Sequence, residues 1–446
     1  MLHHLRRLAL VALFAVPGLS AGAFTRHLWA ASFAQDTPVP EAAAAALEPA
    51  PVDRSTAEAA RELNLYTIPL AAGDHPSINI DWFRNGAQEL RSAEWLSKGY
   101  DGVRFQGEGI EATHLRCTSW DGITIAVRQH EGVVEFRDLT IHAGYDRGTA
   151  FGEQNTPEAQ AARGRPLSPR FQARLVNVRA VVEPPSAYGG KRPKWLVFGY
   201  QVDLFMSRVE LDATEAVEHA VYLHGFARRG AYLDRVDFQG SGAEGFKVRS
   251  DATETVWAGP NQWIILRGCT FRDWFQPWSW RGGGGVVLQG TGANVLLERC
   301  AFYGGTSIGT VTAYQRSKAV MVSSEGESWD AVTGALGTGF GNGSVTLREC
   351  AMFGGPGPDW YSSIARCARN GGSQLSARSF RLERCAVWGR RMNVQISDLP
   401  AGGFEAVGCN TPELREWSEA HGMDTSAEAV FLTSQRAVPL SEGFRR

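Results

Sequence analysis

The chain has 446 residues, of which 43% are apolar and 21% charged, and its formal net charge is -2 at pH 7. A chain of this length and apolar content can bury a large core, which excludes a wholly disordered protein. The balanced charge leaves no basic footprint, so nucleic acid is not expected as a partner. The 50 glycines are spread over the whole length, which indicates many tight turns and therefore many short strands.

The N-terminus has the pattern of an export signal. Two arginines precede the apolar run LALVALFAV, and A-x-A sites end at Ala23 and Ala34. This run is too short to cross a bilayer, which takes about 20 residues. We therefore expect a cleaved signal peptide within residues 1–34 and a secreted or periplasmic protein, with an uncleaved N-terminal anchor as the alternative. The Pro/Ala-rich residues 35–62 are expected to form a flexible tether, and no later segment is apolar enough to span a membrane.

A short repeat organises the rest of the chain. Its frame is an apolar residue, two polar residues, a Cys or Val, any residue and a second apolar residue, as in LERCAF at 297–302. The fourth position of the copies falls at residues 117, 139, 178, 209, 236, 269, 300, 350, 385 and 409. The irregular spacing between these positions indicates one structural unit that carries loops of different length.

A second pattern follows several copies of the repeat. Segments such as HAVYLH (219–224), FKVRSD (246–251) and GVVLQG (285–290) alternate apolar residues with others, as a strand with one buried face does. Each repeat therefore holds at least two short strands, and stacked units of this kind share one core with their neighbours. A leucine-rich repeat would require a steadier spacing, and the gaps of 22 and 24 residues are too short for the four strands of a propeller blade.

With these repeats the chain resembles the pectin-lyase-like superfamily over residues 66–410. The resemblance implies an all-β fold, a single-stranded right-handed parallel β-helix of about ten coils with short terminal caps. We expect this solenoid at residues 63–410 and a C-terminal cap at 411–446. Thr411 and Pro412 are suited to begin a short helix in that cap.

Four of the seven cysteines share the fourth repeat position. Cys269, Cys300, Cys350 and Cys385 stand where other copies have Leu or Val. A thiol that interchanges with Val behaves as a small buried hydrophobe. We therefore expect a stack of free inward thiols, with disulfides between neighbouring coils as the alternative. No metal site is expected, because no spacing typical of a metal ligand set accompanies these cysteines.

A patch of charged and aromatic side chains is expected on two adjacent strands. Alternation directs Tyr222, His224, Lys247 and Arg249 outward, and the equal spacing of the repeat predicts that Tyr222 lies directly beside Arg249. His219 stands at the strand entry, and alternation does not fix its direction. Arginine binds a carboxylate through a planar fork, and Lys, His or Tyr can exchange protons. These five residues are the candidate catalytic set, with a plain solvated surface as the alternative.

A tryptophan-rich segment offers a second candidate surface. The segment at 273–285 contains Trp274, Trp278, Trp280 and Arg281 and is expected to project as a loop. Exposed aromatic rings can stack on sugar rings, so these residues and Asp251 are the candidate substrate-binding set. The alternative is that the tryptophans cover the solenoid as additional core.

The patch favours β-elimination on an acidic polysaccharide. The strings E-H-x-x-Y and G-x-K-x-R-S resemble a stretch of exported β-helix proteins similar to polysaccharide lyases. A glycoside hydrolase would need two placed carboxylates, and no such pair stands out. We therefore expect an exported carbohydrate-active protein, a lyase with an anionic polysaccharide as its partner. No cofactor motif is found, and a need for calcium stays open. The alternative is a non-catalytic glycan-binding or cell-surface structural protein.

Overall fold

The computed structural model describes residues 63–76, 78–81, 98–117, 123–126, 132–144, 149–151, 171–200, 202–227, 229–249, 262–274, 284–289, 293–303, 318–323, 342–353, 363–368, 377–388, 393–396, 399, 402–421, 425–426 and 430–433. All described residues belong to one compact unit, Pro49–Arg446. The predicted signal and tether at 1–34 and 35–62 lie outside the described residues.

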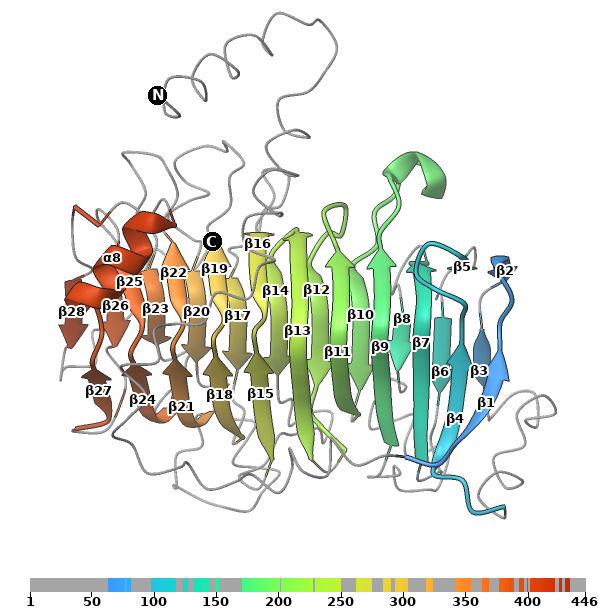
Figure 1. The fold of residues 1–446 in the computed structure, drawn as a ribbon, viewed down its shortest axis with the longest axis horizontal. Coiled ribbons are helices and arrows are strands. Elements are labelled where there is room, and N and C mark those ends of the chain that lie inside the picture. The colour runs from blue at the N-terminus through green and yellow to red at the C-terminus, as the bar shows by residue number, and fades with distance from the viewer. Residues whose placement is uncertain are drawn as a thin grey trace, which may run out of the picture. The chain divides into compact units, whose positions relative to one another are not determined.

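The described residues form two parallel sheets, one of 17 strands and one of 11 strands (Figure 1). The larger sheet contains β1 (Leu65–Pro69), β2 (Gly73–Pro76), β4 (Gly102–Gln106), β5 (Thr113–Arg116), β7 (Gly132–His142), β9 (Phe171–Val181), β11 (Asp203–Asp212), β13 (Gly230–Ser241), β15 (Trp263–Arg267), β16 (Thr270–Trp274), β18 (Asn294–Glu298), β19 (Ala301–Tyr303), β21 (Asn342–Arg348), β22 (Ala351–Phe353), β24 (Ala377–Glu383), β25 (Ala386–Trp388) and β27 (Phe404–Val407). The smaller sheet contains β3 (Asn79–Asp81), β6 (Ile123–Ala126), β8 (Thr149–Phe151), β10 (Trp195–Tyr200), β12 (His219–His224), β14 (Glu244–Arg249), β17 (Gly284–Gln289), β20 (Lys318–Ser323), β23 (Ser363–Ala368), β26 (Asn393–Ile396) and β28 (Val430–Thr433).

Each turn of the chain crosses the larger sheet and then the smaller one. The chain runs through β11 and β12, and the next coil repeats this path through β13 and β14. β11 pairs in parallel with β13, and β12 pairs in parallel with β14. This stacking of equivalent strands is a parallel β-helix, which confirms the predicted all-β solenoid. The 11-stranded sheet receives one strand per coil, so the described residues hold one coil more than the expected ten.

The repeat frame encodes a corner of each coil. The residue before the Cys or Val position has a positive φ, for example 53° at Arg208, 52° at Arg235 and 54° at Arg299. A left-handed residue bends the chain between two strand directions, at a cost of about 1–2 kcal/mol where the residue is not glycine. The copy assigned to Cys117 is wrong, because the pairing of β5 with β7 places Cys117 beside Ala143 and not beside the repeat position at 139.

Inward side chains of successive coils stack in register and fill the core. Phe271 lies between Phe238 and Phe302, with ring centroids 4.4 Å and 4.9 Å apart and interplanar angles of 12° and 3°. These three rings are at most 1% exposed. The stacked rings connect three consecutive coils, so each coil is stabilised mainly by its two neighbours.

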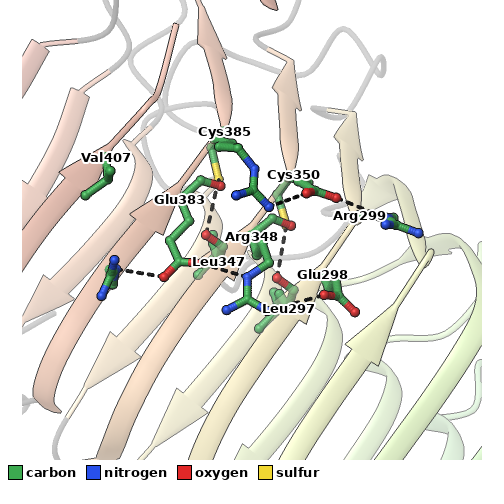
Figure 2. A network of polar contacts seen from close by, with 12 residues as sticks. Leu297, Glu298, Arg299, Leu347, Arg348, Cys350, Glu383, Cys385 and Val407 are labelled. Atoms are coloured by element: carbon green, nitrogen blue, oxygen red, sulfur yellow. Dashed lines mark hydrogen bonds and ion pairs between the residues drawn. The ribbon is translucent and has the colours of Figure 1, made fainter. Parts of the chain in front are cut away.

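The predicted stack of free thiols is confirmed. Cys269, Cys300, Cys350 and Cys385 are at most 1% exposed and are all free. Each thiol donates to a leucine carbonyl of the preceding coil, at S···O distances of 3.7, 3.4, 3.4 and 3.3 Å in chain order. Figure 2 shows two of these contacts, from Cys350 to Leu297 and from Cys385 to Leu347. Burial raises the pKa of the Cys300, Cys350 and Cys385 thiols well above the ordinary value. A buried neutral thiol is unreactive toward solvent reagents.

We expect a thiol reagent to titrate few cysteines in the native protein and at least four after denaturation without reductant. The reason is that the stacked thiols at 269, 300, 350 and 385 are buried but not bonded to one another. The measurement is a colorimetric thiol count in buffer and in denaturant. A denatured count below two would contradict the free stack and favour disulfides.

The predicted C-terminal helix is present as α8 (Pro412–Ala420), and Thr411 is its N-cap. Just before it, the Asn410 side chain accepts from the Val387 backbone N–H at 2.7 Å and donates to the Val387 carbonyl at 2.8 Å. This amide takes the place of a further strand at the edge of β25 and satisfies backbone groups that would otherwise be unpaired. β28 pairs with β26 beyond α8, so the solenoid continues past the boundary predicted at 410. Among the described residues, no helix has the length and apolarity needed to cross a membrane.

Candidate active site

The predicted patch lies on the outer face of the smaller sheet, on β12 and β14. The main core contains the inward residues that the alternation predicted, namely Val221, Leu223, Phe246 and Val248. The side chains that alternate with them point away from this core, namely Tyr222, His224, Lys247 and Arg249. The structure therefore brings the four side chains together on one face of two adjacent coils.

The predicted register between these two strands is wrong by two residues. Tyr222 lies beside Lys247, and His224 lies beside Arg249. The larger sheet does repeat after 27 residues, since Val209 pairs with Val236. The connection from β13 to β14 is shorter than the connection from β11 to β12, because β13 ends at 241 and β14 begins at 244, whereas β11 ends at 212 and β12 begins at 219. The 27-residue spacing of the larger sheet therefore does not apply to the smaller sheet.

The patch is far less exposed than a solvated strand surface. Tyr222 is 7% exposed, His224 is 6% exposed and His219 is 1% exposed. The Lys247 side chain is 12% exposed. Charged and polar groups that lose water in this way must find partners in the protein. These side chains are therefore buried against one another and their neighbours, and the solvated-surface alternative is wrong for them.

His219 is held between two carboxylates. Its Nδ1 lies 2.5 Å from Glu244 Oε2, and its Nε2 lies 3.6 Å from Glu218 Oε2. Burial lowers the pKa of His219 below the ordinary value, although the Glu244 charge acts in the opposite direction. Trp195 Nε1 donates to Glu218 at 3.1 Å. His219 therefore points its nitrogens at protein groups, and its ring lies 4.6 Å from the Tyr222 ring between centroids.

The Tyr222 phenol is buried among charged side chains of the patch. Burial raises its pKa above the ordinary value, and the neighbouring Arg249, which also hydrogen-bonds to it, acts in the opposite direction. Lys247 Nζ lies 5.4 Å from the centre of the Tyr222 ring and 3.7 Å from Glu244 Oε1. A phenol that stays protonated beside a cation can donate a proton to an oxygen that gains negative charge.

An aromatic wall adjoins the patch on the preceding coil, and the sequence analysis missed it. Trp195 stacks on Phe198 with centroids 4.7 Å apart, and Tyr200 stacks on His224 with centroids 5.9 Å apart. These residues belong to β10, which pairs with β12 so that Phe198 lies beside Tyr222. The string WLVFGY before the repeat at Val209 was the available signal, because it is one more strand of the smaller sheet.

The predicted substrate-binding residues are not brought to this patch by the described part of the chain. Trp274 is the last residue of β16, where its backbone pairs with Ser241, so the strand extends into the segment predicted as a loop from 273. The other members of the set lie outside the described residues, namely Trp278, Trp280, Arg281 and Asp251.

Within the described ranges, no group of three or more His, Cys, Asp or Glu residues could hold a metal ion. In the patch, the Glu244 carboxylate contacts His219 and Lys247.

We expect the protein to lose stability as the pH falls from about 7.5 to about 5.5, in part because of His219. The folded-state pKa of His219 lies below the unfolded value of 6.5. Below that value the unfolded chain binds more protons than the folded one, so acid favours unfolding. The measurement is the melting temperature across this range for the wild type, for His219→Gln and for the control His75→Gln. His219→Gln should flatten the profile, and an identical slope in all three proteins would contradict the assignment.

Comparison with known proteins adds one match. No protein-family model and no curated protein matches the chain. Among solved structures, the chain is similar to the Azotobacter vinelandii mannuronan C-5 epimerase AlgE6 A-module, with a TM-score of 0.33 and 12% sequence identity, over 80% of this chain and 92% of that chain. A TM-score this low carries no information about activity, so the function is argued from the patch itself.

Proposed function

We propose that the chain is a lyase that cleaves an acidic, uronate-containing polysaccharide by β-elimination at the outer face of β10, β12 and β14. The observation that carries this proposal is the buried Tyr222 phenol, only 7% exposed, with the Arg249 guanidinium as its hydrogen-bond partner. Lys247 lies directly beside Tyr222, and His224 lies directly beside Arg249, between the paired strands β12 and β14. The N-terminal export signal expected from the sequence would deliver this site to the compartment where such polysaccharides occur.

Each of the four side chains can take one role in β-elimination. In this reaction a base removes the proton on the carbon next to the uronate carboxylate, a carbon–carbon double bond forms, and the bond to the bridging oxygen breaks. Arg249 binds and neutralises the carboxylate, which makes the proton more acidic. His224, which lies beside Arg249, takes the proton. Tyr222 gives its proton to the bridging oxygen, and Lys247 adds positive charge beside it.

The aromatic wall supplies the sugar-binding surface of the proposed site. Trp195 is partly exposed and stacks on Phe198, which is 2% exposed and fixed in place. A rigid aromatic face with a polar edge suits a hydrated ligand such as a sugar ring. Because β10 precedes β12 along the stack of coils, the polysaccharide would run across adjacent coils, with one sugar over Trp195 and the reacting sugar over Tyr222.

The experiment is an assay for the unsaturated uronate product by ultraviolet absorbance. The panel is alginate, pectate and glycosaminoglycans, each with and without calcium. We expect one polymer to yield product with the wild type and far less product with Arg249→Lys, because a point charge does not reproduce the planar fork. A polymer that binds without yielding product would overturn the lyase and favour the non-catalytic glycan-binding protein.

A further inference from the structure

The outer face of the larger sheet carries a charge row that is balanced at its C-terminal end (Figure 2). Glu298 lies between Arg267 at 2.9 Å and Arg348 at 3.5 Å, and Glu383 lies between Arg348 at 2.7 Å and Arg381 at 2.8 Å. Glu405 adds a further carboxylate 3.4 Å from Arg381. Three arginines thus meet three glutamates along the strands, and the row is neutral.

At the other end of the same face the charges are not balanced. Glu135 on β7 is 1% exposed, and three guanidiniums surround it. Arg104 Nε lies 2.6 Å and Arg137 Nε 2.7 Å from Oε1, while Arg174 Nε lies 3.0 Å from Oε2. This group, called the arginine cluster below, has three cations and one anion. It therefore carries two positive charges in excess.

A second carboxylate on the same coil has different partners. Asp138, at the corner of the same coil, accepts from the Gln106 side-chain amide at 2.7 Å and from the Asn177 side-chain amide. It makes no ion pair with the arginine cluster among the contacts of the described residues. Asp138 therefore does not offset the excess charge of the cluster.

The cluster keeps hydrogen-bond donors directed at solvent. A guanidinium has five N–H donors, and Arg104 and Arg137 each use Nε alone on Glu135. Within the described residues, the Nη groups of these two side chains make no hydrogen bond. Their side chains are 25% and 29% exposed. Two guanidiniums that share one carboxylate oxygen are thus held side by side, with their outer nitrogens available to a ligand.

Aromatic residues continue the same row on the next two coils. Arg174 pairs in register with Phe205, and Phe205 pairs with Tyr232. The two rings are stacked with centroids 5.4 Å apart, and the Arg174 guanidinium lies 4.0 Å from the Phe205 ring centre. Tyr232 is partly exposed. A basic cluster followed by a stacked aromatic pair is a surface that suits a charged sugar followed by its neighbour.

We propose that the arginine cluster binds an oxyanion, the carboxylate or sulfate group of an acidic glycan, through the Nη groups of Arg104 and Arg137. A bidentate contact of this kind matches the planar fork of arginine. The ligand supplies the negative charge that Glu135 alone does not. This site lies on the larger sheet, away from the patch on β12 and β14, and it does not depend on the proposed lyase activity.

The test is calorimetric titration of the full chain with inorganic sulfate, a uronate monosaccharide, a uronate oligosaccharide and a sulfated oligosaccharide. Arg104→Gln/Arg137→Gln should weaken oligosaccharide binding at least about tenfold, the loss of one charge-assisted contact or more. The matched control is Arg208→Gln/Arg235→Gln, which removes the same charge from exposed corner residues and should bind as the wild type does. Equal weakening in both double variants, or no binding by the wild type, would overturn the proposal.

A second variant distinguishes loss of the ligand contact from a folding defect. Arg104→Lys/Arg137→Lys keeps the charge that neutralises Glu135, so its melting temperature should match the wild type while its affinity falls, because the fork is lost. Wild-type affinity in this variant would overturn the bidentate contact. Binding of the oligosaccharides in preference to the free anions supports a glycan-borne group. Binding of inorganic sulfate without binding of either oligosaccharide would overturn the glycan assignment.

Discussion

Tyr222→Phe should lower the turnover number on the cleaved polysaccharide by about 10²–10⁴-fold, the usual range for loss of a general acid. The change removes one hydroxyl and leaves the ring that packs against Phe198 and His224. The Michaelis constant should change little, because the phenol acts on the leaving oxygen in the transition state and contributes little to ground-state binding. The measurement is initial rate against substrate concentration for purified wild type and variant.

The matched control for this prediction is Tyr303→Phe. Tyr303 is also a phenol beside a cation, with the Arg272 guanidinium 5.5 Å from its ring centre, but it lies on the larger sheet, on β19. Its loss of a hydroxyl should leave the turnover number unchanged. A Tyr222→Phe protein that keeps the wild-type turnover number, with an unchanged melting temperature, would show that another group protonates the leaving oxygen.

Phe271→Ala should lower the free energy of unfolding by about 3–5 kcal/mol, as large truncations in close-packed cores do. The Phe271 ring is 0% exposed and stacked between Phe238 and Phe302. Its removal leaves a cavity between three coils, and nearest-neighbour contacts are the main source of stability in a solenoid. The measurement is urea-induced unfolding followed by circular dichroism.

Phe271→Leu is the control for cavity size. It retains an apolar side chain at the same position, so it should cost clearly less than Phe271→Ala. If the alanine variant loses less than about 1 kcal/mol, well below the usual cost of such a truncation, the ring stack does not connect the coils. A second unfolding transition in the alanine variant alone would show that the two halves of the stack have become uncoupled.

The repeat could be read from the sequence because it combines a buried position with a bend. The position that Cys300 occupies must hold a small apolar residue. The residue before it is Arg299 in this coil, and the equivalent residue of every comparable coil also adopts a left-handed conformation. Period-two alternation then identified the inward residues of β12 and β14. Both signals are local in the sequence, so loops of any length between coils do not obscure them.

The register and the burial of the patch could not be read in the same way. The register of β12 against β14 depends on the length of the connection from one sheet to the next, and this length differs between adjacent coils. Alternation fixes that Tyr222 points away from the core, but it does not say that Tyr222 is only 7% exposed. Trp195 was missed because its contacts with Glu218 and Tyr222 arise only when β10 pairs with β12.

The central claim is that an acidic polysaccharide binds at the outer face of β10, β12 and β14. The most direct test is a crystal structure of the Tyr222→Phe protein with a uronate oligosaccharide from the polymer that the wild type cleaves. We expect a uronate carboxylate against the Arg249 guanidinium and a sugar ring over Trp195. An oligosaccharide bound on another face, with no density beside Arg249, would contradict the assignment of the site.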